Sequence, residues 1–200
     1  MGKIVHGNEN FGYAPILTDE YGNMSFGNPT MLPGMVSSSM EVTENQTTIY
    51  GDDVSYCVVN GAKARTLDIV LRYIPSAYAE YLGFHINANG MITDTGTYPN
   101  HCVFFEQVEE DCATGSVTKT LWYVYNVKGS EPSRETQTDE EEISAQELTV
   151  SYTSTNSAFV QDDQNVFVQV GYVTRTDANA NAYDSFKTQV LLPTSVLVSA

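Results

Sequence analysis

Apolar and polar side chains alternate with a period of two residues through much of this chain. In residues 64–73, Leu67, Ile69 and Leu71 fall on one face, together with Tyr73, while Asp68 falls on the other. Successive side chains of a β-strand point to opposite faces, so this pattern predicts a half-buried strand. Residues 35–44 alternate in the same way. We expect a second strand there, with Val36, Ser38, Met40 and Val42 on one face.

Similar segments recur along the chain and are separated by short turn sequences. We expect further strands at residues 11–17, 23–26, 47–50, 54–59, 102–108, 117–127, 147–153 and 166–174. Turn-forming sequences lie at residues 19–23, 60–61, 89–90 and 177–179. Many strands joined by short turns predict a mainly β fold, a sandwich or barrel, rather than a parallel α/β fold.

Two short segments have helical spacing. In residues 75–82, Pro75 suits the first turn, and Gly83 suits the left-handed position that follows a helix. Residues 182–190 place Tyr183 and Phe186 three positions apart, on one helical face. Both helices are short enough to act as lids over an open barrel end or a sandwich edge.

Residues 128–142 interrupt the alternation with a polar, acidic stretch. They contain no apolar residue except Pro132 and end in four consecutive acidic residues. Long loops of this kind are solvated, or become ordered on contact with a partner. We expect this loop to be poorly ordered in a free subunit and ordered against a neighbouring one. The chain is therefore expected to form a single domain over residues 1–200, with an N-terminal arm at 1–10 and a polar loop at 128–142.

The charge balance excludes several partners. The chain has 25 acidic and 9 basic residues and a formal net charge of −16. Binding nucleic acid or an anionic membrane requires clustered Lys and Arg, so neither is expected. We also find no targeting segment and no apolar stretch long enough to cross a bilayer. The odd set Cys57, Cys102 and Cys112 contains no CxxC pair, which favours a chain made in a reducing cytoplasm. In that setting, the sequons at Asn23 and Asn45 carry no glycosylation.

The sequence contains no recognisable catalytic motif. His6, His85 and His101 are isolated and are expected to be surface or packing residues. His101 and Cys102 are neighbours on a predicted strand, so they point to opposite faces and cannot easily form one site. No HExxH, GxSxG, GxGxxG or phosphate-binding loop is present. We therefore predict no catalytic, cofactor-binding or metal-binding residue.

Two acidic patterns resemble metal or acid–base sites only in part. Asp177, Asn179 and Asn181 match the first ligand positions of an EF-hand loop, but Ala182 stands in place of the required Gly and Thr188 in place of the bidentate Glu. An Asn-rich turn is the simpler interpretation. The adjacent pairs at residues 52–53 and 162–163 lie in turn-like sequences and have no partner that we can place.

Short matches in a fixed order then indicate a family. The stretches are KIVHG at residues 3–7, YAPI at 13–16, LPG at 32–34, IYGDD at 49–53, LDIVL at 67–71, FFE at 104–106, LWYVYN at 121–126 and EEISAQELT at 141–149. Together they cover residues 3–175 and resemble the major tail protein family of phages with long, non-contractile tails, in the branch found among phages and prophages of Gram-positive bacteria. Ser76 and Ala77 depart from the family, which has acidic residues at the start of this helix, and residues 191–200 do not align.

The resemblance implies a structural virion protein that is not an enzyme. Its subunits would form hexameric rings that stack into a tail tube, with neighbouring sheets joined side by side around a lumen that conducts DNA. Its partners would be copies of itself, the tape-measure protein, the tail terminator and the distal tail or baseplate proteins. Assembly would take place in the host bacterial cytoplasm. Acidic charge on the lumen would let DNA pass without sticking. The side chains expected there are those of Glu41, Asp68, Glu106 and Thr149.

Three other readings remain open at this point. An inner tube of a contractile tail, or a ring protein of a secretion system, would show the same β pattern. A monomeric β-sandwich that binds carbohydrate through its tyrosines and Trp122 is also compatible with the aromatic content. An enzyme has no support in the residues.

Overall fold

The computed structural model describes residues 3–52, 54–134 and 147–194, and these are mainly β-structure. The elements, in chain order, are β1 (Lys3–Thr18), β2 (Met24–Phe26), β3 (Thr30–Met31), β4 (Met35–Gly51), β5 (Val54–Leu71), α1 (Ser76–Ala79), the 3₁₀ turn η1 (Glu80–Leu82), β6 (Phe84–Ile86), β7 (Ile92–Asp94), β8 (His101–Asp111), β9 (Val117–Gly129), β10 (Ser133–Arg134), β11 (Leu148–Ser154), β12 (Val170–Thr174), α2 (Ala180–Asp184) and η2 (Ser185–Lys187).

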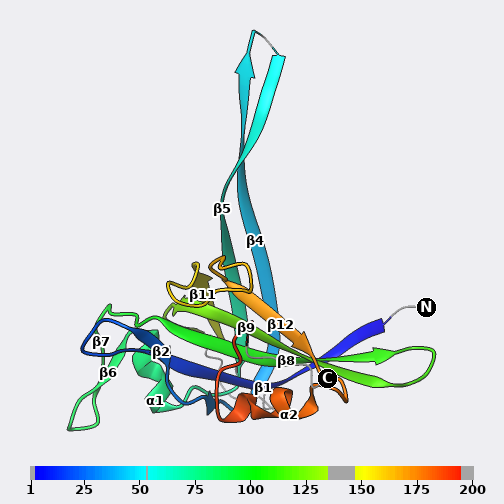
Figure 1. The fold of residues 1–200 in the computed structure, drawn as a ribbon. Coiled ribbons are helices and arrows are strands. Elements are labelled where there is room, and N and C mark those ends of the chain that lie inside the picture. Colours follow the sequence, from blue (N-terminus) through cyan, green and yellow to red (C-terminus); the bar gives the residue numbers. More distant parts are fainter. Residues whose placement is uncertain (1–2, 53, 135–146, 195–200) are drawn as a thin grey trace, which may run out of the picture.

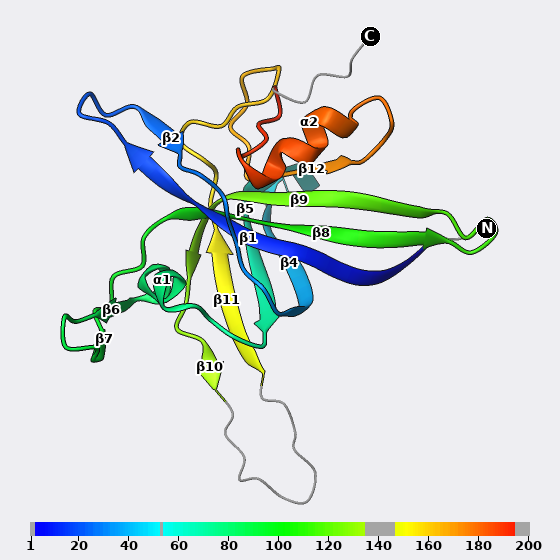
Figure 2. The ribbon, with the colours of Figure 1, turned by 90° about the horizontal axis from the view of Figure 1, so that it is seen from below.

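One antiparallel sheet contains all of these strands except the small β6–β7 hairpin. Its main order is β2-β1-β8-β9-β11-β5-β4, with β3 beside β1 and β10 beside β11. The far edge of β9 carries two neighbours, since β12 pairs with Thr120–Val124 and β11 with Val127–Gly129. The sheet curls until β4 approaches β1, where Ser38 Oγ lies 3.4 Å from Asn8 Oδ1 (Figures 1 and 2). The architecture is a partly open barrel, in agreement with the predicted fold class.

Both faces of the central strands are buried. The inner core, inside the curled sheet, contains Phe11, Tyr13, Leu32, Leu67, Ile69, Leu71, Tyr78, Leu82, Val103, Phe105, Val124, Val127, Val150 and Tyr152. The outer core lies on the opposite face, beneath α2 and η2, and contains Ala14, Cys102, Phe104, Leu121, Tyr123, Tyr125, Val160, Tyr183, Phe186 and Leu191 (Figure 2). Alternate residues of β8 therefore enter different cores, which explains why six consecutive residues at its start are buried.

The β4–β5 hairpin projects well beyond the body (Figure 1). Its turn is at Asp52, which has a positive φ of 50°, and β5 runs without interruption through residues 60–61. The turn predicted at residues 60–61 is therefore wrong, and the segments at 47–50 and 54–59 are the outer ends of two long strands. The physical reason is a β-bulge. The pairing passes from Glu44 opposite Lys63 to Gln46 opposite Asn60, so Gly61 serves an irregular pairing instead of a turn.

The predicted register of β5 is confirmed at Leu67, Ile69 and Leu71, which are all buried. Tyr73 was predicted on the same face, but it lies beyond the end of the strand and is 60% exposed. Val36 was predicted on the same strand face as Met40. A register shift between Met35 and Ser37 instead turns Met35 toward the core and leaves Val36 exposed.

The first helix occurs where predicted, with Pro75 as its N-cap and Gly83 left-handed at φ 89°. The second begins at Ala180, two residues before the predicted start, and buries Tyr183 and Phe186 as expected.

Three predicted boundaries move. Residues 3–10, the predicted arm, belong to β1, and Lys3–Glu9 pair with β8. Lys128 and Gly129, at the start of the predicted loop, end β9, and Ser133–Arg134 pair with β11. The rest of the loop, from residue 135, lies outside the described residues. The last predicted strand, residues 166–174, is regular only from Val170.

Candidate interaction surfaces

The histidines do not form a site. His6 lies on β1 with its Nε2 3.6 Å from a carboxylate oxygen of Glu110, and His85 is exposed on β6. His101 is fully buried. Burial lowers the pKa of His101 from its ordinary value of 6.5 to about 4, so the ring is neutral near pH 7.

A buried hydrogen-bond chain gives His101 a structural role. Its Nδ1 lies 2.9 Å from the carbonyl of Pro99, which can only accept, so Nδ1 carries the proton. Nε2 must then accept from the Tyr78 hydroxyl at 3.1 Å, and the Tyr78 oxygen accepts from Tyr152 at 2.6 Å. These hydrogen bonds connect α1 to β8 and β11. His101 is thus a packing residue, one of the two roles expected for it.

Glu106 was expected on the lumen, and this is wrong because its side chain is buried. Its Oε1 accepts from the Tyr183 hydroxyl at 2.8 Å, and its Oε2 accepts from Asn10 Nδ2 and lies 4.0 Å from Lys119 Nζ. These partners come from α2, the β1 bulge and β9. Glu106 therefore holds α2 against the sheet.

In the segment that partly matches an EF-hand loop, Asn179 also forms hydrogen bonds within the protein. Asn179 precedes α2, its Nδ2 donates to the carbonyl of Thr174 at 2.9 Å, and its Oδ1 accepts from the Thr176 amide at 2.8 Å. Asp162 Oδ1 accepts the amides of Gln164 and Val166 within its own turn. Across residues 3–52, 54–134 and 147–194, no three His, Cys, Asp or Glu side chains are grouped as metal ligands would be.

A polar face covers the outside of β4, β5 and β11. Three rows cross these strands: Ser37–Val70–Thr149, Ser39–Asp68–Ser151 and Glu41–Thr66–Thr153. We call these nine residues the hydroxyl face. None of them is buried, and all except Val70 are polar. The opposite side of the same strands carries Leu67, Ile69, Val150 and Tyr152 of the inner core. This face includes the predicted lumen residues Glu41, Asp68 and Thr149.

The hydroxyl face carries negative charge and no cation. Glu41 and Asp68 are its charged members, and basic residues occur only at its borders. Lys128 is opposite Thr153 at the end of β9. Arg72 follows β5 and lies 3.2 Å from a carboxylate oxygen of Glu147.

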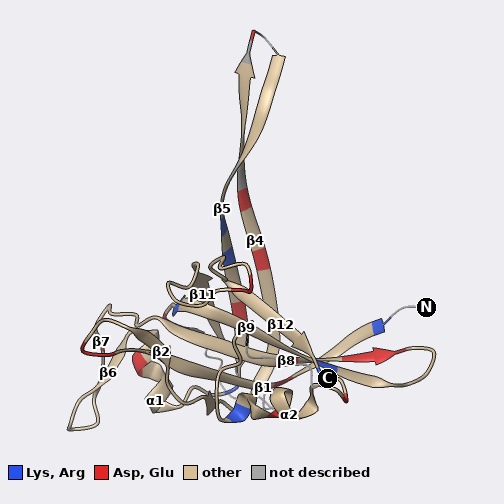
Figure 3. Ribbon diagram, in the orientation of Figure 1, with Lys and Arg blue, Asp and Glu red and all other residues tan. Residues whose placement is uncertain are grey.

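The outer part of the hairpin, residues 45–62, forms a second surface, which we call the distal hairpin. In the sequence, its only charged residues are the acids at positions 52–53. Below it, Glu44 and Lys63 form an ion pair, and Figure 3 shows charges on the lower half of β4 and β5 but not along the upper strands. Its exposed large apolar side chains are those of Ile49, Tyr50, Val54, Tyr56, Val58 and Val59.

A third surface is an apolar groove of about 430 Å³ where the inner core is open to solvent, near the base of the hairpin. It is lined by Ser38, Met40, Val42, Arg65, Phe105, Gln107, Trp122, Val170 and Tyr172. Trp122 and Tyr172 stack with ring centroids 4.7 Å apart, and Tyr172 is 67% exposed. The other end of the inner core is closed by α1, through Tyr78 against Tyr13.

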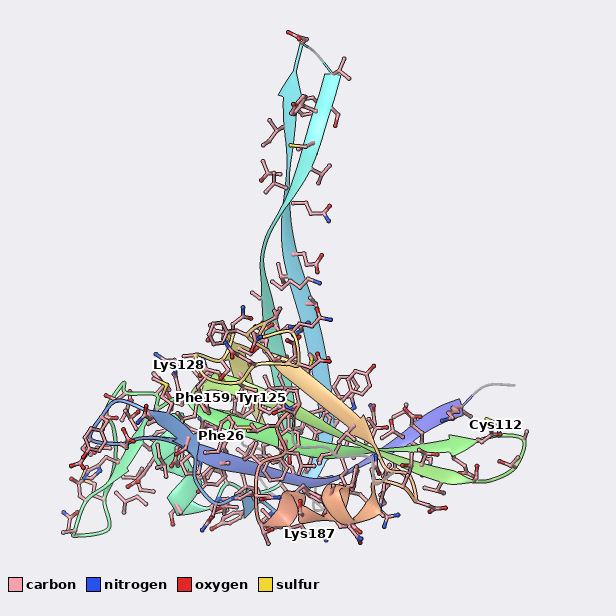
Figure 4. All side chains as sticks on the ribbon, viewed as in Figure 1. Phe26, Cys112, Tyr125, Lys128, Phe159 and Lys187 are labelled. Carbon is pink, nitrogen blue, oxygen red and sulfur yellow. The ribbon has the colours of Figure 1, made fainter. Side chains whose placement is uncertain are left out.

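The predictions from sequence missed both the distal hairpin and the groove. Eighteen consecutive residues with charge only at positions 52–53 were a usable signal for the hairpin. No local sequence signal marked the groove, because its residues come from five strands that are far apart in sequence. Figure 4 shows the body densely filled with side chains, where the ring of Phe26 lies near those of both Tyr125 and Phe159. None of the helices within the described ranges is long and apolar enough to cross a membrane.

The chain is similar to a known protein family and to solved structures. A sequence model of the family described as "Phage tail tube protein" matches residues 2–200. Among solved structures, the cryo-EM structure of the anti-feeding prophage cap, described as a tube-terminating cap, matches with 12% identity and a TM-score of 0.44, covering 83% of this chain and 89% of that one. No curated protein matches the sequence.

Proposed function

Because this chain belongs to the phage tail tube protein family, we propose that it assembles as six-membered rings that stack into the tube of a long, non-contractile tail and that phage DNA passes through the tube. Membership makes it a structural component of the virion tail and not an enzyme. Within the proposal, assembly takes place in the cytoplasm of the bacterial host.

The hydroxyl face is the observation that carries the DNA-conducting part of the proposal. A wall that lets DNA slide must be wettable and must not bind phosphates, because each Lys or Arg contact releases counterions and adds affinity. The hydroxyl face meets both needs: neutral Ser and Thr side chains surround Glu41 and Asp68, and no cation lies within its rows. We therefore assign this face to the bore.

Closure of the sheet between copies supports the ring. Among the described strands β4 is the last in the sheet order, and although β1 approaches it at Ser38, no described strand pairs with its outer edge. Exposed edges invite pairing with another chain. Pairing along β4 would extend the hydroxyl face from one copy to the next around the bore. The tape-measure protein would occupy that bore before ejection, and the terminator and distal tail proteins would close its two ends.

Electron microscopy of the purified protein at high concentration tests the proposal. We expect rings and hollow tubes with six-fold symmetry, and a reconstruction in which β4, β5 and β11 line the bore. A particle that stays at 22.0 kDa at every concentration would favour a monomeric binding module instead. Tubes with the hydroxyl face on their outer surface would refute the assignment of the bore.

A further inference from the structure

We propose that the distal hairpin of one copy docks in the apolar groove of a second copy, with the Trp122–Tyr172 pair as its main contact. This inference rests on the proposed function, because it needs copies of the chain to assemble. It adds the two surfaces that meet.

The distal hairpin exposes large apolar side chains that would be more stable in contact with another surface. Tyr56 is 84% exposed, Tyr50 70% and Val54 66%, on a two-stranded ribbon that no other described strand adjoins. Such a ribbon is marginally stable by itself, and contiguous exposed apolar side chains mark interaction sites. A solvated arm would carry charges along its length, as the lower half of the same hairpin does with Glu41, Glu44 and Lys63.

The groove provides an apolar surface that could cover the exposed side chains of the distal hairpin. Apolar side chains from β4, β8, β9 and β12 line it, and the exposed ring of Tyr172 extends its wall.

The charges of the two surfaces are complementary. Among the described residues that line the groove, Arg65 is the only charged one, and in the sequence the acids at positions 52–53 are the only charged residues of the distal hairpin. Arg65 donates to the Gln169 side chain and is partly buried. Complementary charges of this kind favour the correct partner and orientation more than they add affinity.

The occupant must come from another copy. Ser38, Met40, Val42 and Arg65 belong to β4 and β5, so the strands that form one wall of the groove continue outward as the hairpin. A straight ribbon cannot fold back into its own base. Each copy thus has one arm and one groove, and such head-to-tail contacts are satisfied for every copy only in a closed ring or a continuing filament.

The only tryptophan of the chain provides a direct test, because all tryptophan emission comes from Trp122 in the groove. Wild-type protein is assembled by raising its concentration while acrylamide quenching of Trp122 and the critical concentration are measured. The same is done for Tyr56→Ser in the distal hairpin. Tyr21→Ser is the matched control, since Tyr21 is 82% exposed at the β1–β2 turn, outside both surfaces.

We expect assembly to protect Trp122 from acrylamide. Tyr56→Ser should raise the critical concentration at least about ten-fold, the lower end for burying a large side chain, and Tyr21→Ser should leave it unchanged. Arg65→Glu should weaken assembly, and Asp52→Arg in the same chain should restore part of it. A merely structural role of Arg65 would show no such rescue.

Two outcomes would overturn the docking in different ways. If wild-type tubes form with Trp122 quenched as in the free subunit, and Tyr56→Ser behaves as Tyr21→Ser does, the docking is wrong and the proposed tube stands. If wild-type protein forms neither rings nor tubes, both are wrong.

Discussion

Lowering the pH should destabilise the subunit through one buried ring, that of His101. In the folded protein its pKa is about 4, against an ordinary value of 6.5, because burial disfavours the charged form. Between these two values the unfolded chain binds a proton that the folded chain does not. Protonation of the unfolded chain at His101 therefore lowers the free energy of unfolding as the pH falls from 6.5 toward 4. Above pH 6.5 the ring is neutral in both states and causes no such loss. At about 1.4 kcal/mol per pKa unit, the loss is about 3 kcal/mol.

The assay compares wild type with His101→Gln by urea unfolding of dilute protein at several pH values between 7 and 4. The Gln amide oxygen can still accept from Tyr78, but the side chain cannot take up a proton. All other titrating groups, including the acids behind the net charge of −16, are common to both proteins and cancel in the difference. We expect wild type to lose about 3 kcal/mol relative to the variant across this range.

The matched control is His85→Gln, which makes the same substitution at an exposed position on β6. If the difference between wild type and His101→Gln does not change with pH, then His101 is not held neutral by burial. The proton assignment in the Tyr152–Tyr78–His101 chain would then have to be abandoned.

Three further predictions concern packing and the bore. Gly129→Ala would place a Cβ 2.5 Å from Leu82 Cδ2, so it should cost about 1–3 kcal/mol in urea unfolding, whereas Gly7→Ala, with 3.9 Å of room, should cost little at this contact. Tyr183→Phe removes the hydroxyl that Glu106 accepts from and should cost about 1–3 kcal/mol, with no loss in a Tyr21→Phe control. Ser39→Lys should leave assembly intact and make tubes retain DNA in a salt-sensitive way, whereas Ser25→Lys, on exposed β2 away from the hydroxyl face, should not. Free passage of DNA through Ser39→Lys tubes would contradict the assignment of the bore.

Local patterns in the sequence were sufficient for most of the strands. The alternation that placed Leu67, Ile69 and Leu71 inside depends only on the period of a strand, and Pro75 and Gly83 marked the first helix by backbone preferences. The bulges were not predictable in this way, because Gly61 is compatible with either a turn or a bulge, and the choice depends on pairing with β4.

The failures at the candidate surfaces have a different cause, since they depend on distant residues. Glu106 looked like a polar strand residue, but its partners Asn10 and Tyr183 lie 96 and 77 positions away. The apolar residues of the distal hairpin followed the pattern of half-buried strands, yet their side chains are exposed. Alternation shows that a face is to be covered, but it does not show whether the cover belongs to the same molecule.

The continuity of β4 and β5 from the hairpin turn to the body has a mechanical consequence. A pull on the hairpin along its length would be transmitted to the ladder between Arg65–Leu71 and Leu148–Ser154, which runs along the same strands. Such a load acts in shear and strains the hydrogen bonds of the ladder together, instead of peeling them apart one after another. If the hairpin docks on a second copy as proposed above, a tail that bends would pass tension from one subunit into the sheet of the next.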